Sequence, residues 1–226
     1  MSEKDTDHHI LYSFRRCPFA MRSRLALNSA GISYELREVK LKDKPQAMVD
    51  LSAKATVPVL KRGDGEILDE SRDIMIWALE QNDPEGWLDP PEGDMEEMED
   101  LMDMIEDEFK PHLDRYKYST RYEGADPLFH RDRAEVYILK LERRLTDSGQ
   151  PYLMGNRPSL ADMATFPFIR QFASTDRQRF DTFPCPNLRD WLNSLVNADA
   201  FSSAMVKYDP WVPGDQPLWL PVLTSG

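Results

Sequence analysis

The first part of the chain alternates between short strand-like runs and helical runs. Residues 10–14 are apolar and aromatic, and residues 34–41 carry apolar side chains in a strand pattern. Between them, residues 18–29 have a helical composition that ends at Gly31. The pattern predicts a strand, a helix and a second strand.

The stretch that follows predicts a hairpin between two helices. Residues 44–51 favour a short helix, and residues 71–81 favour a longer one. Between these helices, the apolar runs 57–60 and 66–68 flank an Arg-Gly-Asp-Gly segment that is typical of a β-hairpin. The order βαβ then ββα predicts a small four-stranded mixed sheet with helices on its faces.

The rest of the chain has helical periodicity and almost no strand pattern. Apolar residues recur at spacings of three and four along one long amphipathic helix. They are Met95, Met98, Leu101, Met102, Ile105, Phe109, Leu113 and Tyr116. Further helices are predicted over residues 131–145, after Ser159 and around Trp191. Ser159, with Asp162 three residues later, has the form of a capping box.

Turn-forming and helix-breaking residues separate the two patterns. Residues 82–93 contain Asn-Asp-Pro-Glu-Gly and Asp-Pro-Pro-Glu-Gly, which are typical of a linker. The charge changes at the same place. Residues 1–84 carry 13 basic and 14 acidic side chains, whereas residues 85–226 carry 15 and 26. We therefore expect an α/β domain over residues 1–84 and an all-helical domain over residues 85–226.

The composition and the net charge argue against several classes of protein. The chain has 226 residues, 41% of them hydrophobic and 30% charged, as in an ordinary folded protein. No run approaches the roughly 20 apolar residues of a membrane helix, and the polar start differs from a secretory signal, so a cytoplasmic location is expected. A net charge of -12 disfavours nucleic acid and anionic lipid as partners.

Candidate chemistry lies at the first strand-to-helix junction. Cys17 directly precedes Pro18, and proline suits the first turn of a helix because it lacks the N–H that is unpaired there. The helix N-terminus favours the thiolate form of such a cysteine, and Arg15 and Arg16 would add to this. A dithiol redox protein would have its second cysteine at position 20, which is Ala20 here. An oxidised Cys17 therefore needs an external thiol to be reduced. The alternative for an isolated Cys-Pro pair is a buried, inert thiol.

The second cysteine and the histidines give weaker signals. Cys185 lies in a proline-rich connector without charged neighbours, which indicates a structural thiol. The histidines have neither i, i+4 pairing nor a cysteine partner at metal-ligand spacing. They are His8, His9, His112 and His130. No metal site is expected.

Four short motifs follow one another along residues 10–82. They are Cys17-Pro18-Phe19-Ala20, Lys42-Asp43-Lys44-Pro45, Thr56-Val57-Pro58-Val59-Leu60 and Asp69-Glu70-Ser71. Together they resemble the cytosolic glutathione S-transferase superfamily, and its cysteine-type, omega-like members most closely. The resemblance implies a thioredoxin-like N-terminal domain, an all-helical C-terminal domain, a glutathione site on the first and a second-substrate pocket between them. It also implies a homodimer.

The resemblance also implies a set of glutathione contacts. Glu70 would face the ammonium group of the γ-glutamyl end, and Ser71, as the N-cap of its helix, would hold the glutamyl carboxylate. Pro58 would be a cis proline that turns the backbone of Val57 toward the cysteinyl part of glutathione. The glycyl carboxylate would lie within reach of Lys44.

The resulting hypothesis is a thiol transferase that uses glutathione as cosubstrate. Phe19 completes its predicted glutathione site. Cys17 would form a mixed disulfide with glutathione while reducing a small molecule or a protein disulfide. One alternative is conjugation of glutathione to electrophiles, with a hydroxyl such as that of Ser13 activating the glutathione thiol. A second alternative is a non-catalytic module that binds partners through the acidic residues of 92–108.

Overall fold

A computed structural model of the chain describes residues 8–221. These residues divide into two compact units. The first contains the residues up to Glu85 and those from Asp199 onward, and the second runs from Gly86 to Ala198. The end of the chain therefore differs from the expected division, because the residues after Ala198 belong to the α/β unit.

The first unit is built on a five-stranded mixed sheet with the strand order β4-β3-β1-β2-β5. Its strands are β1 (His9–Ser13), β2 (Tyr34–Glu38), β3 (Val59–Lys61), β4 (Ile67–Leu68) and β5 (Trp219–Leu220). β1 is parallel to β2, and the other pairings are antiparallel. Four of the strands were predicted. The fifth comes from the C-terminal segment and pairs with the edge of β2.

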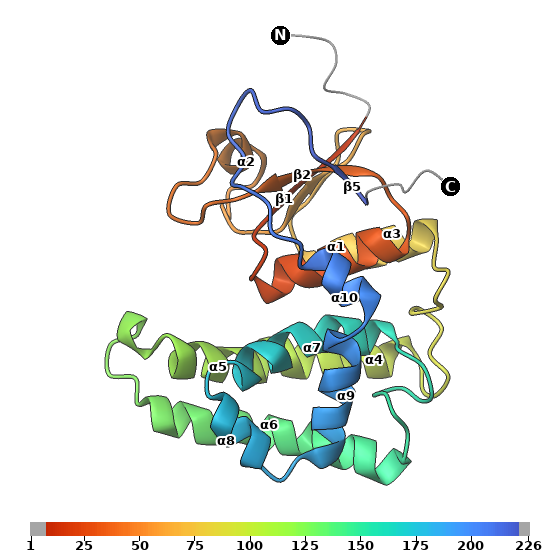
Figure 1. The fold of residues 1–226 in the computed structure, drawn as a ribbon, viewed down its shortest axis with the longest axis vertical. Helices are drawn as coiled ribbons and strands as arrows, with labels where there is room; N and C mark the ends of the chain where they lie inside the picture. The colour runs from red at the N-terminus through yellow and green to blue at the C-terminus, as the bar shows by residue number, and fades with distance from the viewer. Residues whose placement is uncertain (1–7, 222–226) are drawn as a thin grey trace. The chain divides into compact units, whose positions relative to one another are not determined.

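Helices cover both faces of this sheet. α1 (Pro18–Ser29) and α3 (Ser71–Gln81) pack together on one face, and α2 (Gln46–Leu51) lies on the other (Figure 1). Alternate side chains of a strand point to opposite faces, so Ile10 and Tyr12 pack on the side of Met48 from α2. The short helix α10 (Asp199–Ala204) contacts α1.

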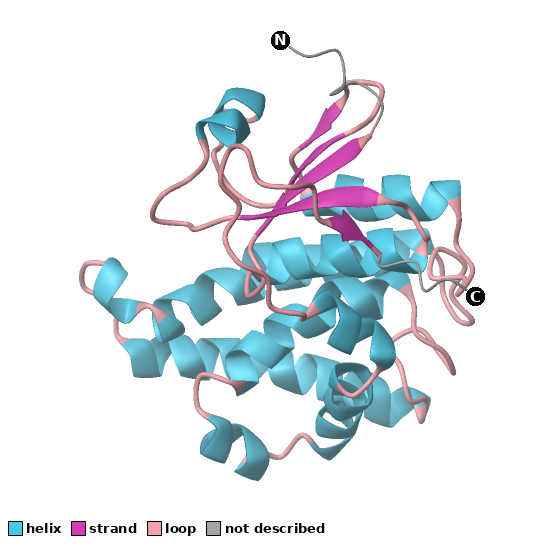
Figure 2. Cartoon of the chain, turned by 45° about the horizontal axis from the view of Figure 1, so that its top comes forward, coloured by secondary structure: helices cyan, strands magenta, loops and turns pink. Residues whose placement is uncertain are grey.

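The second unit consists of helices joined by loops (Figure 2). The helices are α4 (Met95–Asp103), η1 (Met104–Phe109), α5 (Lys110–Lys117), η2 (Ser119–Arg121), α6 (Pro127–Ser148), α7 (Leu160–Ala173), α8 (Arg177–Thr182) and α9 (Pro186–Val196). The predicted long helix is present, but η1 is a π-helical segment within it. Among residues 8–221, no helix has the length and apolar character needed to cross a membrane.

The predicted capping box forms at the start of α7. The Ser159 hydroxyl accepts a hydrogen bond from the Asp162 N–H, and the Asp162 carboxylate accepts one from the Ser159 N–H at 2.9 Å. The same carboxylate accepts hydrogen bonds from the Leu153 N–H at 2.8 Å and the Trp191 indole at 2.7 Å. Burial raises the pKa of Asp162, and these hydrogen bonds oppose the rise. The box thus ties α7 to α9.

Candidate functional site

Cys17 lies at the N-terminus of α1, as predicted. It is the N-cap residue, Pro18 is the first helical residue, and the first turn of the helix contains no acidic side chain. The Cys17 N–H donates to the Phe14 carbonyl at 3.0 Å, which closes the turn between β1 and α1. The thiol is partly exposed. Unpaired N–H groups at a helix start stabilise negative charge, so this position favours a thiolate.

The turn before β3 approaches the thiol from a distant part of the chain. The Val57–Pro58 peptide bond is cis, as expected. The Cys17 Sγ atom lies 3.7 Å from the Val57 carbonyl oxygen, at hydrogen-bonding distance for a sulfur donor. The structure therefore brings together Cys17 and the backbone group that was predicted to contact the cysteinyl part of glutathione.

The start of α3 differs in detail from the prediction. α3 begins at Ser71, so Glu70 and not Ser71 is the N-cap residue. The Ser71 hydroxyl is buried and accepts hydrogen bonds from Nε and Nη2 of Arg22, at 3.0 and 2.7 Å. Arg22 was not predicted as part of the site because its contact joins α1 to α3 across 49 residues. The backbone N–H of Ser71 still belongs to the first turn of α3.

Lys54 is a second charged residue that sequence analysis missed. Its Nζ atom lies 2.5 Å from Oε1 of Glu70 and 2.9 Å from Oδ1 of Asp69. The Ser52 hydroxyl also donates to Asp69, at 2.7 Å. The Ser52 hydrogen bond and the Lys54 ammonium lower the pKa of Asp69, and the two carboxylates raise the pKa of Lys54. Glu70, the predicted partner of an ammonium group, therefore already faces one.

The two remaining predicted residues lie on the same unit. Phe19 is in the first turn of α1, and the Arg22 guanidinium lies 5.2 Å from the centre of its ring. Lys44 is exposed in the loop before α2. The contacts that join Cys17 to Val57, and Glu70 to its neighbours, do not involve Lys44.

The hydroxyl groups of Tyr12 and Ser13, on the strand before Cys17, are buried and hydrogen-bonded. Ser13, the rival to Cys17 in the sequence analysis, has no exposed surface, and its hydroxyl accepts a hydrogen bond from Nη1 of Arg24. The Tyr12 hydroxyl accepts one from Nη1 of Arg37 at 2.7 Å. A hydroxyl must reach the sulfur of a bound thiol to activate it. Both hydroxyls are buried, so neither is accessible to the thiol of a bound glutathione.

Cys185 provides an internal comparison for Cys17. It too is an N-cap residue followed by a proline, at the start of α9, but it is completely buried. Arg189, one turn later, lies 3.8 Å from its sulfur, a charged neighbour that the sequence analysis did not expect. Burial outweighs this cation and raises the pKa of Cys185 to about 11. Burial and the raised pKa both disfavour the thiolate, in line with the predicted structural role.

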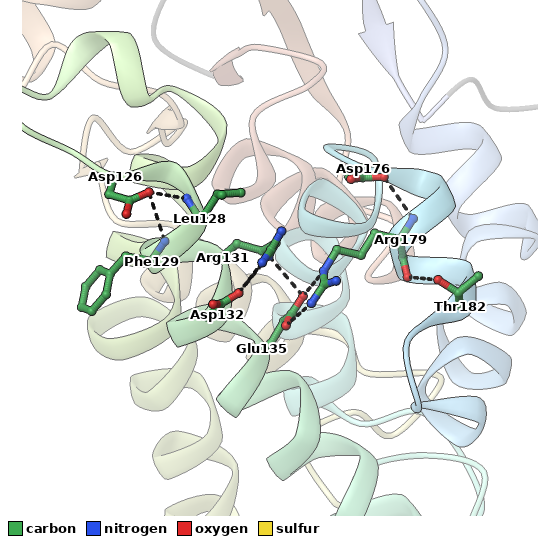
Figure 3. Close-up of polar contacts among 9 residues, drawn as sticks. All are labelled: Asp126, Leu128, Phe129, Arg131, Asp132, Glu135, Asp176, Arg179 and Thr182. Atoms are coloured by element: carbon green, nitrogen blue, oxygen red, sulfur yellow. Dashed lines mark hydrogen bonds and ion pairs between the residues drawn. The ribbon is translucent and has the colours of Figure 1, made fainter.

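The second unit contains a polar cluster beside a small cavity. Glu135 forms a two-point ion pair with Arg179 at 2.5 and 2.7 Å, and Arg131 approaches the same carboxylate (Figure 3). Asp176 caps α8 by accepting from the Arg179 N–H at 3.0 Å. The adjoining cavity, beside Tyr116, has a volume of about 10 Å³, room for about one water molecule. This cluster joins α6 to α8 and leaves no space for a ligand.

Two histidines that are far apart in the sequence meet in this unit. Nδ1 of His112 on α5 lies 2.8 Å from Nδ1 of His130 on α6. Burial lowers the pKa of both, and the other imidazole, Arg133 and Arg115 lower that of His112 further. Among the described residues, no group of three or more His, Cys, Asp or Glu side chains is arranged to hold a metal ion.

Comparisons with known proteins agree with this architecture. The family model described as "Glutathione S-transferase, N-terminal domain" matches residues 11–87, and the one described as "Glutathione S-transferase, C-terminal domain" matches residues 92–194. Glutathione S-transferase omega-1 of Mus musculus is 27% identical over 193 residues, which cover 85% of this chain and 78% of the mouse protein.

Two further matches extend the comparison. Glutathione S-transferase DHAR2 of Arabidopsis thaliana is 24% identical over 202 residues, covering 88% of each chain. A solved structure of a glutathione transferase family member from Pseudomonas fluorescens, with two glutathione bound, aligns with a TM-score of 0.75 at 20% identity. That alignment covers 90% of this chain and 94% of the other, and it establishes a shared fold.

Proposed function

Because this chain belongs to the glutathione S-transferase superfamily and has omega-class relatives, we propose that it is a glutathione-dependent thiol transferase whose nucleophile is Cys17. The observation that carries the proposal is the position of the thiol. Cys17 is partly exposed at the N-terminus of α1 and lies 3.7 Å from the Val57 carbonyl. The hydroxyl that would support conjugation instead, that of Ser13, is buried.

The proposed reaction has two thiol–disulfide exchanges. The Cys17 thiolate attacks the glutathione sulfur of a glutathionylated substrate, and the substrate sulfur leaves as a thiolate that takes up a proton. Cys17 is then joined to glutathione by a mixed disulfide. The thiolate of a second glutathione attacks the glutathione sulfur of that bond, which releases oxidised glutathione and restores the Cys17 thiolate. Reduction of dehydroascorbate is a related reaction, with two glutathione molecules as the reductant.

We assign the glutathione site to the same face of the first unit. The backbone of Val57 beside Pro58 pairs with the cysteinyl part of glutathione, like an added strand. Glu70 holds the ammonium group, and the N–H groups at the start of α3, with Ser71 first, hold the glutamyl carboxylate. Support for this part comes from the hydrogen bonds that orient Ser71 and from the ion pair of Glu70 with the Lys54 ammonium.

Two further contacts complete the proposed site. Lys44 reaches the glycyl carboxylate from the loop before α2, where its side chain is exposed. Phe19 lies in the first turn of α1, two residues after Cys17, and covers the sulfur end of glutathione. Both assignments rest on the resemblance of the Lys42 to Pro45 and Cys17 to Ala20 motifs.

The proposal is tested by treating the protein with oxidised glutathione and measuring the intact mass. One glutathione on Cys17, located by peptide mapping and removed by fresh reduced glutathione, is the expected result. Cys185 stays unmodified in the same sample because it is buried. An unmodified Cys17 in a protein that binds glutathione would contradict the mechanism and favour conjugation. Failure to bind glutathione would favour an interaction module.

A homodimer and a cytoplasmic location complete the proposal. The resemblance implies the dimer, and α6 carries an exposed apolar stripe of Phe129, Val136 and Leu139. A Val136→Lys variant that elutes as a monomer, when the unmodified protein elutes as a dimer, would support that interface. The location follows from the need for reduced glutathione, which the cytosol maintains.

A further inference from the structure

A buried cation lies behind the loop that carries Cys17. Arg24 is on α1, and its side chain is almost entirely inaccessible to solvent. Its Nη2 atom donates to the Arg15 carbonyl at 2.7 Å, and its Nη1 atom donates to the Phe14 carbonyl at 3.5 Å and to the Ser13 hydroxyl. The guanidinium therefore binds successive residues of the turn between β1 and α1.

The C-terminal segment completes this arrangement from the other side. Nε of Arg24 donates to the Ala204 carbonyl at 3.0 Å, at the end of α10. Arg15 donates through its side chain to the Met205 carbonyl at 3.4 Å and through its backbone N–H to Glu38 at 2.8 Å. The turn before Cys17 is thus held by α1, β2 and the C-terminal segment together.

We propose that Arg24 is a positioning residue for Cys17, because it fixes the turn that presents the thiol and supplies a permanent buried positive charge that favours the thiolate. The inference deepens the proposed function and rests on it for the role of Cys17. It assigns to this arginine, and to the C-terminal segment that helps to bury it, a part in setting the reactivity of the sulfur.

The charges around Arg24 support this role. Burial lowers its pKa, while attraction to Tyr34, Glu38 and Cys17 raises it and repulsion from Arg15 lowers it. An arginine remains protonated near neutral pH even so. Since the interaction between two groups is reciprocal, a cation that Cys17 stabilises also stabilises the Cys17 thiolate. Low local polarity makes that attraction stronger than the same attraction in water.

Arg24 does not bind a ligand of its own. The cavity beside it, lined also by Asn28 and Tyr208, has a volume of about 10 Å³, which admits about one water molecule. All of its donor nitrogens point to protein acceptors. Its hydrogen bonds are therefore made to the turn before Cys17 and to the end of α10.

The test is the pH dependence of Cys17 alkylation by iodoacetamide, followed by peptide mass spectrometry in the full-length protein. Because only the thiolate reacts, the midpoint of the rate profile reports the thiol pKa. Arg24→Gln should raise the midpoint by about one unit, so that alkylation below the midpoint is about tenfold slower. Arg24→Lys, which keeps the charge but loses the planar fork, should give a smaller shift.

Arg16→Gln is the charge-matched comparison. Arg16 directly precedes Cys17 but is exposed, so water screens it. We expect a smaller shift for Arg16→Gln than for Arg24→Gln. An equal or larger shift would overturn the proposal and assign the effect to the neighbouring surface charge.

Glu38→Gln keeps the proposal testable if the Arg24 variants do not fold. Glutamine retains an acceptor for the Arg15 N–H but removes the carboxylate that partly neutralises Arg24. The midpoint should then move down, opposite to the shift in Arg24→Gln. An unchanged or raised midpoint in Glu38→Gln would overturn the proposal. Alkylation requires no glutathione, so its result is independent of whether Cys17 forms a mixed disulfide.

Discussion

At the scale of single residues, burial distinguishes the two Cys-Pro pairs. Cys17 and Cys185 are each followed by a proline, and each is the N-cap residue of a helix. The sequence predicted the helix start for Cys17 but placed Cys185 in a proline-rich connector, and local sequence does not state how deeply a side chain is buried. Cys185 has no exposed surface and a raised pKa, whereas Cys17 is partly exposed.

Replacing the two cysteines separately should separate chemistry from packing. Cys17→Ser should lower the glutathione-dependent reductase rate by about 100-fold or more, because a serine hydroxyl is not ionised near neutral pH and is a poor nucleophile. Its melting temperature should stay within a few degrees of the unmodified protein. The matched control, Cys185→Ala, should keep the reductase rate. Undiminished turnover by folded Cys17→Ser would exclude the proposed nucleophile.

Lys54 gives a second residue-scale prediction. Lys54 forms an ion pair with the Glu70 carboxylate. We propose that this same carboxylate binds the ammonium group of glutathione. Lys54→Met should free that carboxylate and lower KM for glutathione by about two- to fivefold, since an exposed ion pair competes only weakly for the carboxylate. Lys207→Met, an exposed lysine in the C-terminal segment, serves as the control. A rise in KM would mean instead that Lys54 itself binds a carboxylate of glutathione.

At the scale of helices and strands, the sequence predicted the helix starts that are marked by residues close together in the chain. Pro18 marks the start of α1, and the Ser159 box marks the start of α7. The bounds of α3 agree with the prediction, but its N-cap is Glu70 and not Ser71. The N-cap is defined by the extended backbone of Glu70, which the identity of the Ser71 side chain does not reveal. The π-helical segment was missed because it preserves the apolar stripe of the long helix.

The capping box should be unusually important for stability. Asp162 accepts hydrogen bonds from four buried donors, on Leu153, Ser159 and Trp191. Asp162→Ala would leave these donors without an acceptor and should lower the free energy of unfolding by about 3 kcal/mol or more. Asp126→Ala, which removes the exposed N-cap of α6, should cost only about 1 kcal/mol. Urea denaturation measures both, and equal losses would refute the special role of Asp162.

The contact between α5 and α6 should make stability depend on pH. The pKa of His112 and that of His130 are both lowered from 6.5 in the folded protein. As the pH falls, the unfolded chain therefore binds protons at a higher pH than the folded protein does. The contribution of the two histidines to the free energy of unfolding is complete above pH 6.5 and is lost as the pH falls below it. The melting temperature should fall between pH 7.5 and 5, and the fall should be smaller in a His112→Asn, His130→Asn variant. Identical slopes in the two proteins would contradict this.

At the scale of the whole molecule, the sequence predicted both kinds of domain but misassigned the end of the chain. The change of pattern near residue 84 follows from local composition. The return of residues 199–221 to the α/β unit depends on long-range contacts, such as the pairing of β5 with β2. Strand pairing between Tyr34 and Leu220, far apart in the sequence, has no local signature. The proposed site could be assigned from the sequence because its residues lie in four short motifs.

The returning segment should stabilise the first unit through Trp211. Its backbone N–H donates to the Glu38 carbonyl at 2.8 Å, and the Arg37 guanidinium lies 4.4 Å from the centre of its ring. Trp211→Ala should lower the free energy of unfolding by about 2 kcal/mol, because it removes both packing area and a cation–π contact. Val212→Ala, at an exposed neighbouring position, should change it by less than about 0.5 kcal/mol.

Urea denaturation and limited proteolysis together decide how this segment is held. If Trp211 anchors it, the Trp211→Ala variant should be cleaved after α10 sooner than the unmodified protein, since a released β5 exposes backbone to the protease. Such cleavage would also remove the strand that covers the edge of β2. Equal cleavage rates in the two proteins would mean that the backbone pairing of β5 holds the segment without the tryptophan.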